Sequence, residues 1–400
     1  MGSIVPCSGG IGYCEIENPE YGGNRKTSPG NRRQKVKISP WQLFWMFTTL
    51  EISMSIWLTV SPSIEIARQD AWISLVVAGV IGLFVTLICI RVSQRHSSHT
   101  LVEFAQKLFG KWIGKLIAVL YILMWFSVSS DILRIFSLFI KQFLFHNTPI
   151  WVIASLMVAA MIYINYAGSI EAIARFSEMA GPLLLVGILI TFGLNLTNLH
   201  PSLILPIYAD TGIQAILKGS FVNASFLGES MMIMMLTPFI ANSQKMVKPT
   251  LLAILVPSVI AVMTAIMVIM TFGANIGSTL IFPYFSMVRF INYLEFVQNM
   301  DVWIMFIWIF SVFVKLAIYL FINSYGTAQL LGIKNWRNVI LFAAILIFTI
   351  SLVPANIVGM LDYAKYVWIL YVFPIFIVGL PLIFLLVSLV RGQSLAQEPK

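Results

Sequence analysis

The chain alternates between long apolar runs and short polar connections. The runs measure about 17 to 25 residues, which is the length that an α-helix needs to cross a bilayer. They stay apolar throughout instead of alternating at every second residue, so helices are favoured over the strands of a β-barrel. The pattern predicts an all-α polytopic membrane protein with ten transmembrane helices, at 41–61, 71–90, 116–140, 150–167, 179–198, 218–240, 251–273, 302–322, 338–357 and 366–390.

Prolines predict where several of these helices end or bend, because proline removes a backbone donor and clashes with the preceding turn. Pro62 is expected to end the first span and Pro238 the sixth, and Pro149 directly precedes the fourth. Pro182 falls inside the fifth span, where a break is expected. Pro374 is expected to kink the tenth span.

The composition agrees with a membrane protein, since 59% of the residues are apolar and only 10% are charged. Soluble domains carry about 25% charged residues. No polar connection is long enough to enclose a core of its own, so 39–392 is predicted to form one membrane domain. A basic tail at 1–38, predicted to be disordered and cytoplasmic, precedes it, and a short cytoplasmic tail at 393–400 follows.

Positive charge orients the predicted bundle, because Lys and Arg accumulate on the cytoplasmic side of short loops. With the N-terminus inside, eighteen basic residues fall on the inner side and five on the outer side, so both termini are predicted to be cytoplasmic. The net charge of +9 then requires no nucleic-acid partner, since anionic lipid attracts juxtamembrane basic residues. In the outer connection 274–301, polar residues spaced by three over 284–298 predict an amphipathic interfacial helix.

Five ionisable residues lie within the predicted spans, namely Glu51, Asp131, Arg134, Glu229 and Lys315. On insertion scales such a residue near the bilayer centre costs about 2.5 to 3.5 kcal/mol, so it usually faces a polar cavity. The alternative for the two glutamates is a protonated side chain that is hydrogen-bonded to a neighbouring helix.

The positions of the two glutamates match those of an inverted repeat. Glu51 is the eleventh residue of the first span and Glu229 is the twelfth residue of the sixth. Many transporters consist of two inverted five-helix halves with the binding site between these two helices at mid-membrane. The sequence therefore predicts half-repeats at 41–198 and 218–390, with a site near the two glutamates.

The sixth span carries the strongest local signal for such a site. Gly228 weakens the helix beside Glu229, and Ser225 and Phe226 precede it. A broken helix here would expose N–H donors suited to a ligand carboxylate. The first span offers only Ser53 and Ser55 beside its glutamate, with no glycine. Its unwinding is less strongly indicated, and hydroxyls that bond back to an intact helix are the alternative.

The other intramembrane charges have simpler explanations beside a functional one. Asp131 and Arg134 are three residues apart and can pair on their own helix. Lys315 has no acid within one turn of its own helix, so a partner is expected from Glu51, Glu229 or Asp131. Snorkelling of its ammonium group to the inner surface is the alternative.

Motifs for enzymatic chemistry are missing from the sequence. It contains no GxxxxGK[ST], HExxH or GxSxG pattern, and its three cysteines and four histidines lack the spacing of a metal site. An enzyme is therefore not expected, and neither is a cofactor or a metal.

Several segments resemble one known family across nearly all of the membrane domain. They are ISPWQLF at 38–44, QDAWIS at 69–74, FLGES at 226–230, NMDVW at 299–303 and FVK at 313–315. The chain is similar to the B subunits of bacterial spore germinant receptors. These belong to the endospore germination permease family within the amino acid-polyamine-organocation superfamily.

The resemblance implies a ten-helix fold of the broken-helix, LeuT-like type. It implies that a small germinant, an amino acid or a nucleoside, binds near the first, third, sixth and eighth helices. It also implies partner subunits, a larger membrane A subunit and a lipoprotein C subunit, in the inner membrane of the spore. Ser53 stands where the family often has a glycine.

The leading hypothesis is a subunit that binds a germinant in a transporter-like pocket and signals to its partners. A proton-coupled amino-acid transporter, in which Glu51 or Glu229 carries the proton, is the alternative. An ion pathway opened during germination is a third hypothesis. Glu229→Gln and Gly228→Leu are each expected to abolish the germinant response at a normal protein level.

Overall fold

The computed structural model describes residues 37–208, 211–291, 300–354, 359 and 364–390. The chain divides into two units, Met1–Lys35 and Val36–Lys400, and every element below belongs to the second. Most of the predicted tail at 1–38 and all of 393–400 lie outside the described residues, so the predicted domain boundaries stay predictions.

The described elements are helical, apart from one isolated parallel bridge between Ile38 and Ile240. The first half of the unit contains α1 (Pro40–Met54), η1 (Ser55–Thr59), α2 (Val60–Ala67), η2 (Arg68–Asp70), α3 (Ala71–Arg95), α4 (Leu101–Phe109), α5 (Lys111–Phe143), α6 (Ile150–Ala167), α7 (Ser169–Asn195), η3 (Leu196–Asn198) and η4 (Pro201–Ile204). The second half contains α8 (Gly212–Leu227), η5 (Gly228–Met232), α9 (Ile233–Leu236), η6 (Thr237–Phe239), η7 (Ser243–Met246), α10 (Val247–Gly277), α11 (Pro283–Arg289), α12 (Met300–Leu331), α13 (Arg337–Ser351), η8 (Ala364–Gly379) and α15 (Leu380–Val390).

Seven helical stretches in the described residues are long and apolar enough to cross a membrane. One of them, Pro40–Arg95, contains two of the predicted spans, because the chain turns at Arg68 with a φ of 46°. Two further predicted spans fall on shorter segments, the sixth on α8 to α9 and the ninth on the 15-residue α13. The chain is a multi-pass membrane protein, and the count of ten helices stays a prediction.

The proline predictions are partly wrong. Pro62 lies inside the first turn of α2, where the donor that proline lacks is not needed, so the helix continues to Ala67. Pro182 likewise lies inside a continuous α7. As predicted, Pro149 caps α6 and Pro238 lies in the 3₁₀ turn η6. Pro374 lies inside the π-helical η8.

The predicted interfacial helix is partly described. Its first part forms α11, where Tyr284 and Phe285 are buried and Arg289 is exposed. This division of polar and aromatic residues agrees with the amphipathic pattern. The rest of the predicted helix, 292–298, lies outside the described residues.

The start of α1 is stabilised by local capping and by hydrogen bonds to a distant part of the chain. Ser39 and Gln42 form a reciprocal capping box, with bonds of 2.8 and 3.0 Å, and Pro40 occupies the first turn. The amide of Ile38 donates to Phe239 O at 2.8 Å, and the amide of Ala241 donates to Ile38 O at 2.9 Å. These bonds tie the start of α1 to the end of the α8–η6 segment.

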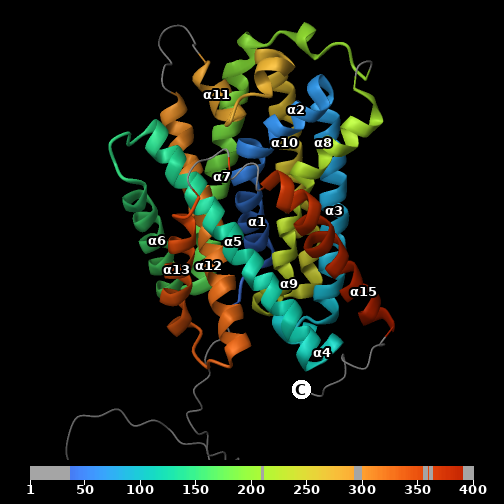
Figure 1. The fold of residues 1–400 in the computed structure, drawn as a ribbon, viewed down its shortest axis with the longest axis vertical. Coiled ribbons are helices and arrows are strands. Elements are labelled where there is room, and N and C mark those ends of the chain that lie inside the picture. Colours follow the sequence, from blue (N-terminus) through green and yellow to red (C-terminus); the bar gives the residue numbers. More distant parts are fainter. Residues whose placement is uncertain (1–36, 209–210, 292–299, 355–358, 360–363, 391–400) are drawn as a thin grey trace, which may run out of the picture. The chain divides into compact units, whose positions relative to one another are not determined.

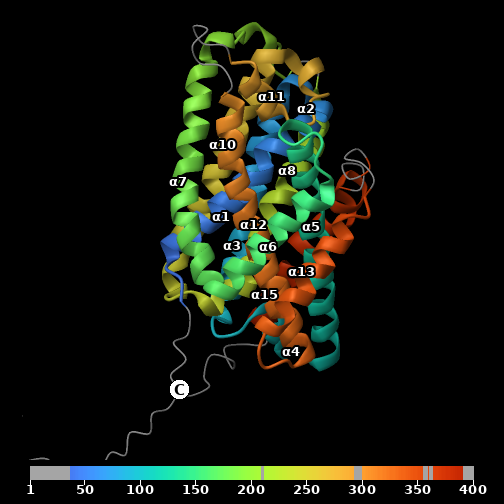
Figure 2. The same cartoon turned by 90° about the vertical axis from the view of Figure 1, so that its left-hand side faces the viewer.

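Helix α1 runs through the middle of the bundle (Figures 1 and 2). Every residue from 46 to 61 is buried, and α1 packs against α7, α10 and α12. Figure 1 shows α2 and α11 at one end of the bundle and α4 at the other. The polar residues of α1 and η1 therefore lie in the interior, where each needs a partner.

Candidate ligand-binding site

The first helix is interrupted in its middle by η1, five residues of π-helix between α1 and α2. Trp308 Nε1 donates a 2.7 Å hydrogen bond to Ser53 O beside this interruption. The Ser53 hydroxyl also bonds back to Leu50 O at 2.6 Å, as in the alternative for an intact helix. Wider π-helical turns are frequent at functional sites. The first helix is thus interrupted without a glycine, with an indole from α12 bonded to its backbone.

The sixth helix is interrupted by overwinding. Residues Gly228–Met232 form the 3₁₀ segment η5 between α8 and α9, and the Gly228 amide donates to Ala224 O. The free N–H donors expected at this glycine are therefore not available there. Gly228 instead permits close packing, since a Cβ atom on it would lie 2.2 Å from Cγ2 of Ile377 in η8.

Two of the intramembrane charges form an ion pair between helices. Lys315 Nζ on α12 lies 2.8 Å from Glu229 Oε2 in η5, and both side chains are fully buried. This is the interhelical partner that the sequence predicted for Lys315. Because water does not reach the pair, the attraction between its two charges is screened little.

Glu51 completes this buried group. It is 1% exposed and lies within electrostatic range of Glu229 and Lys315. The Tyr319 hydroxyl lies within range of both glutamates. Among the described residues, neither carboxylate oxygen of Glu51 has a hydrogen-bond partner. The group thus brings together two acids and one base, so that Glu51 has no counter-charge of its own.

Asp131 and Arg134 do not form the expected intrahelical pair. No ion pair joins them among the ion pairs of the described residues. Arg134 is buried, whereas Asp131 is partly exposed to a cavity that it lines. The two residues therefore have separate environments on α5.

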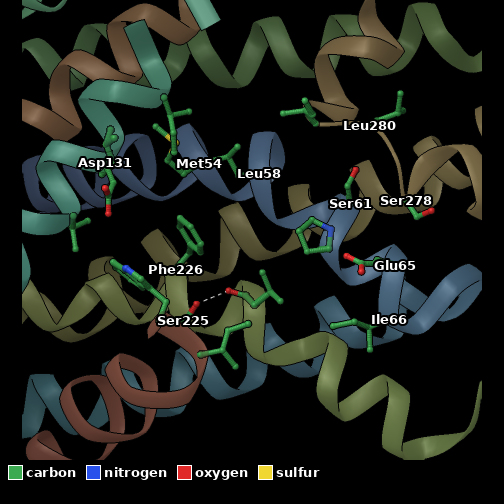
Figure 3. Close-up of a pocket in the computed structure, with 18 of the residues that line it drawn as sticks. Met54, Leu58, Ser61, Glu65, Ile66, Asp131, Ser225, Phe226, Ser278 and Leu280 are labelled. Atoms are coloured by element: carbon green, nitrogen blue, oxygen red, sulfur yellow. Dashed lines mark hydrogen bonds between the residues drawn. The ribbon is translucent and has the colours of Figure 1, made fainter. Parts of the chain in front are cut away.

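A cavity of about 310 Å³ lies between the two interrupted helices (Figure 3). Its walls come from α1 to α2, α5, α8, residues 278–281 and η8. Of the predicted site residues, Asp131, Ser225 and Phe226 line it. The other residues predicted for the ligand site or the charge network do not belong to its lining. They are Glu51, Ser53, Ser55, Gly228, Glu229, Arg134 and Lys315.

Phe226 connects the cavity to the buried charges. Its ring lines the cavity and stacks on Trp368, with centroids 5.8 Å apart and planes at 19°. Lys315 Nζ lies 5.8 Å from the centroid of the same ring. A cation at this distance is attracted by the face of an aromatic ring. One side chain therefore contacts both the space for a ligand and the ion pair.

Several lining residues were missed by the sequence reasoning. Ser61 is the last residue of the first predicted span and Glu65 falls in the predicted connection after Pro62, but α2 continues through both and places them four residues apart, on one helical face. Ser278 and Thr279 lie in an outer connection, and Trp368 is one of several aromatic residues in its span. The continuation of α2 could have been predicted, because proline is tolerated in the first turn of a helix. No sequence feature indicated that Ser278, Thr279 or Trp368 would line the cavity.

Comparisons with known proteins agree with this architecture. The spore permease family, described as "Spore germination protein", matches residues 37–358. The chain belongs to this family. Spore germination protein KB of Bacillus subtilis (strain 168) is 28% identical over 76% of this chain and 81% of its own length. Spore germination protein A2 of the same organism is 25% identical over 76% and 82%.

Solved transporter structures share the fold of this chain. MhsT in complex with L-phenylalanine superposes with a TM-score of 0.65 at 13% identity, covering 81% of this chain and 84% of MhsT. Mhp1, a nucleobase-cation-symport-1 family transporter, gives a TM-score of 0.59 at 12% identity, covering 82% and 74%. These likenesses confirm the predicted LeuT-like, broken-helix fold.

Proposed function

We propose that this chain is the germinant-sensing membrane subunit of a spore germination receptor. It binds a small molecule, an amino acid or a nucleoside, in the cavity between the interrupted helices. The observation that carries the proposal is this cavity of about 310 Å³, which is lined by Leu58 in η1 and by the last turns of α8, directly before η5. Its volume is at the small end of the range of ligand pockets, about 300 to 1,000 Å³, which supports a small ligand.

Signalling requires that the ligand favours one conformation over another. Phe226 offers a physical link, because it lines the cavity and lies over the Lys315 ammonium group. A ligand that moves this ring changes the surroundings of the Lys315–Glu229 pair, and with them the packing of α12 against η5. The proposed receivers of this change are an A-type subunit and a lipoprotein C-type subunit in the inner membrane of the spore.

In this proposal the chain acts by binding and not by catalysis. With both termini in the cytoplasm, the residues of α2 and the connection 278–281 that line the cavity belong to its outer side. A germinant would then reach the cavity from outside the inner membrane.

A proton-coupled amino-acid transporter is the second candidate, and one observation favours it. Glu51 is buried, and among the described residues its carboxylate has no hydrogen-bond partner, which suits a residue that takes up a proton. Purified protein in vesicles separates the two functions. Uptake of labelled amino acid driven by a pH gradient favours the transporter, and binding without uptake favours the sensor.

The test of the proposed site is a variant that fills the cavity. Val222→Trp places an indole among the lining residues of α8. Leu189→Trp is the matched control, because Leu189 on α7 is 61% exposed and does not belong to the lining. Spores that carry each variant as the only copy are compared over a panel of amino acids and nucleosides.

We expect Val222→Trp to lower the germination rate about tenfold or more at a normal protein level on immunoblots. Leu189→Trp should germinate as the unchanged protein does. A full response of Val222→Trp spores would reject the assigned cavity.

A further inference from the structure

The hydroxyl groups that line the cavity have a common hydrogen-bonding pattern. Ser61 donates to Gly277 O at 2.8 Å, and Ser225 donates to Val222 O at 2.7 Å. Ser278 and Thr279 donate to the carbonyl groups three residues before them, at 2.9 and 2.8 Å. Each hydroxyl has a single proton to donate. All four therefore present only acceptor lone pairs to a ligand.

The ionisable side chains of the described lining residues have one sign of charge. They are Asp131 and Glu65, and no Lys, Arg or His belongs to the described part of the lining. No hydrogen bond or ion pair joins Asp131 to another described residue through its side chain, and Figure 3 shows its carboxylate in the cavity wall near Phe226. A carboxylate accepts hydrogen bonds and cannot donate them when ionised.

The Lys315 ammonium group, which lies near the lining residue Phe226, already has an ion-pair partner. The Lys315 ammonium group is fully buried, paired with Glu229 and lies over the Phe226 ring, which itself faces the cavity. Among the side chains that the structure describes in the lining, the indole N–H of Trp368 is the one donor outside the hydroxyl groups, and it is neutral. A ligand carboxylate thus meets acceptors and negative charge, whereas a ligand ammonium group meets complementary groups.

We propose that the cavity selects ligands by a positively charged primary amino group, with Asp131 as its counter-charge. The N–H donors of the ammonium group bond to the Asp131 carboxylate and to hydroxyl oxygens such as that of Ser225. The face of the stacked Phe226–Trp368 pair adds cation–π attraction. The ligand class is a small amine or an amino acid bound by its ammonium end, in preference to neutral nucleosides and free carboxylates. This inference rests on the proposed function only in taking the ligand to be the germinant.

The test measures the charge preference of the cavity without any germinant. A single thiol is placed in the lining as Ser225→Cys, in protein whose Cys7, Cys14 and Cys89 are replaced by Ser or Ala. Protein in nanodiscs, accessible from both sides, is treated with 2-aminoethyl methanethiosulfonate, a cation, or with 2-sulfonatoethyl methanethiosulfonate, an anion of similar size. Ser202→Cys, at an exposed position of η4, is the control thiol.

The readout is the ratio of the two modification rates, cation over anion. We expect this ratio to be at least about tenfold higher at Ser225→Cys than at Ser202→Cys, because one charge a few ångströms away in a medium of effective dielectric constant about 20 has an effect of this size or more. Adding Asp131→Asn should reduce the ratio at Ser225→Cys by most of this factor and leave the ratio at Ser202→Cys unchanged.

Three results would overturn the proposal. The first is a cation-over-anion rate ratio that is the same at the two thiols. The second is a ratio at Ser225→Cys that Asp131→Asn leaves unchanged. The third is a Ser225→Cys thiol that reacts with neither reagent. The proposed function fails by a different result, namely a full germinant response of Val222→Trp spores. The two failures are therefore distinguishable.

Discussion

Lys315 and Glu229 lie on different helices and form a 2.8 Å ion pair that solvent does not reach. Glu51 lies close to this pair, but its carboxylate has no hydrogen-bond partner among the described residues. The two glutamates that occupy matching positions in the sequence therefore differ in the fold, because only Glu229 has a counter-charge in contact.

This difference predicts opposite outcomes for two isosteric substitutions. Glu229→Gln leaves the Lys315 ammonium group buried without its counter-charge, and breaking a buried pair in this way costs about 3 to 5 kcal/mol. Glu51→Gln leaves no cation without its contacting partner, so its free energy of unfolding should change by less than about 1 kcal/mol. Unfolding of the two purified variants in the same detergent compares them directly.

A double variant distinguishes the cost of an unpaired buried charge from the cost of changed side-chain packing. Glu229→Gln combined with Lys315→Met removes both charges and should be more stable than either single variant, since no buried charge is left over. Equal destabilisation by Glu51→Gln and Glu229→Gln would contradict this account. A loss of germinant response in Glu229→Gln alone therefore reports on stability as well as on binding, and a normal protein level is no longer expected for it.

The bond from Trp308 to the backbone of the first helix leads to a second prediction. Trp308→Phe removes the donor to Ser53 O but keeps an aromatic ring against Trp57, whose ring lies 4.4 Å away. A buried carbonyl left without its donor costs about 1 to 3 kcal/mol. Hydrogen exchange of the amides in η1 should be faster in this variant, because the interruption loses an anchor.

Trp303→Phe is the matched control for this experiment. Trp303 is on the same helix α12 and is 68% exposed. Its substitution should leave exchange in η1 unchanged. Equal exchange rates in Trp308→Phe and Trp303→Phe would show that the indole bond does not stabilise the interruption.

The sequence alone indicated a multi-helix membrane fold and three of the residues that line the candidate cavity, and the limit has a physical reason. Apolar runs and intramembrane charges are local features of the sequence. They were therefore sufficient to predict the membrane spans, to single out Glu229 and to predict that Lys315 needs a partner from another helix. Which acid would pair with Lys315 depends on how α12 crosses η5, and that is a tertiary property. The contribution of Trp368 to the cavity depends in the same way on how η8 packs against α8.

The effects of one proline and one glycine were also predicted incorrectly in part. The sequence predicts that Pro62 ends the first helix, although proline in a first turn is well tolerated. The sequence also predicts a break of the sixth helix at Gly228, and the helix is interrupted there, but the Gly228 amide is bonded instead of free and its missing side chain makes room for Ile377. In both cases the residue type was informative, but its physical effect depended on its neighbours.

A third prediction concerns pH and lies outside the membrane-spanning segments. His96 follows α3 and stacks on Phe104, with ring centroids 5.3 Å apart. Burial lowers the pKa of His96 below its usual 6.5, and the nearby His99, Arg95 and Lys107 lower it further. Between the lowered pKa and 6.5 the unfolded chain binds more protons than the folded one, so stability falls as pH falls through this window.

The measurement is the melting temperature at pH 7.5 and at pH 5.5. His96→Gln removes the titrating group and should show a smaller drop between the two pH values than the unchanged protein. His146→Gln, at an exposed position, controls for the loss of an imidazole. A drop that is the same with and without His96 would exclude it as the source.

The close contact between Gly228 and Ile377 carries the last prediction. In Gly228→Ala the new Cβ would lie 2.2 Å from Cγ2 of Ile377 and 3.2 Å from its Cβ. Ile377 is β-branched and stiff, so η8 must shift away from η5. Overpacking of this kind costs about 1 to 3 kcal/mol. Gly193→Ala on α7 is the control, because nothing lies within 4 Å of its Cβ position, and alanine there should stabilise by up to about 1 kcal/mol.

A compensating substitution makes this prediction specific. Ile377→Ala removes Cγ2 and so makes room for the new methyl group, at the loss of its own packing. Gly228→Ala should therefore destabilise less in the Ile377→Ala background than in the unchanged chain, and additive effects would contradict the contact. The larger Gly228→Leu is expected to reduce the protein level for the same reason. Because Trp368 lies on the same η8 as Ile377, displacement of η8 also disturbs the stack on Phe226, and the germinant response should fall together with stability.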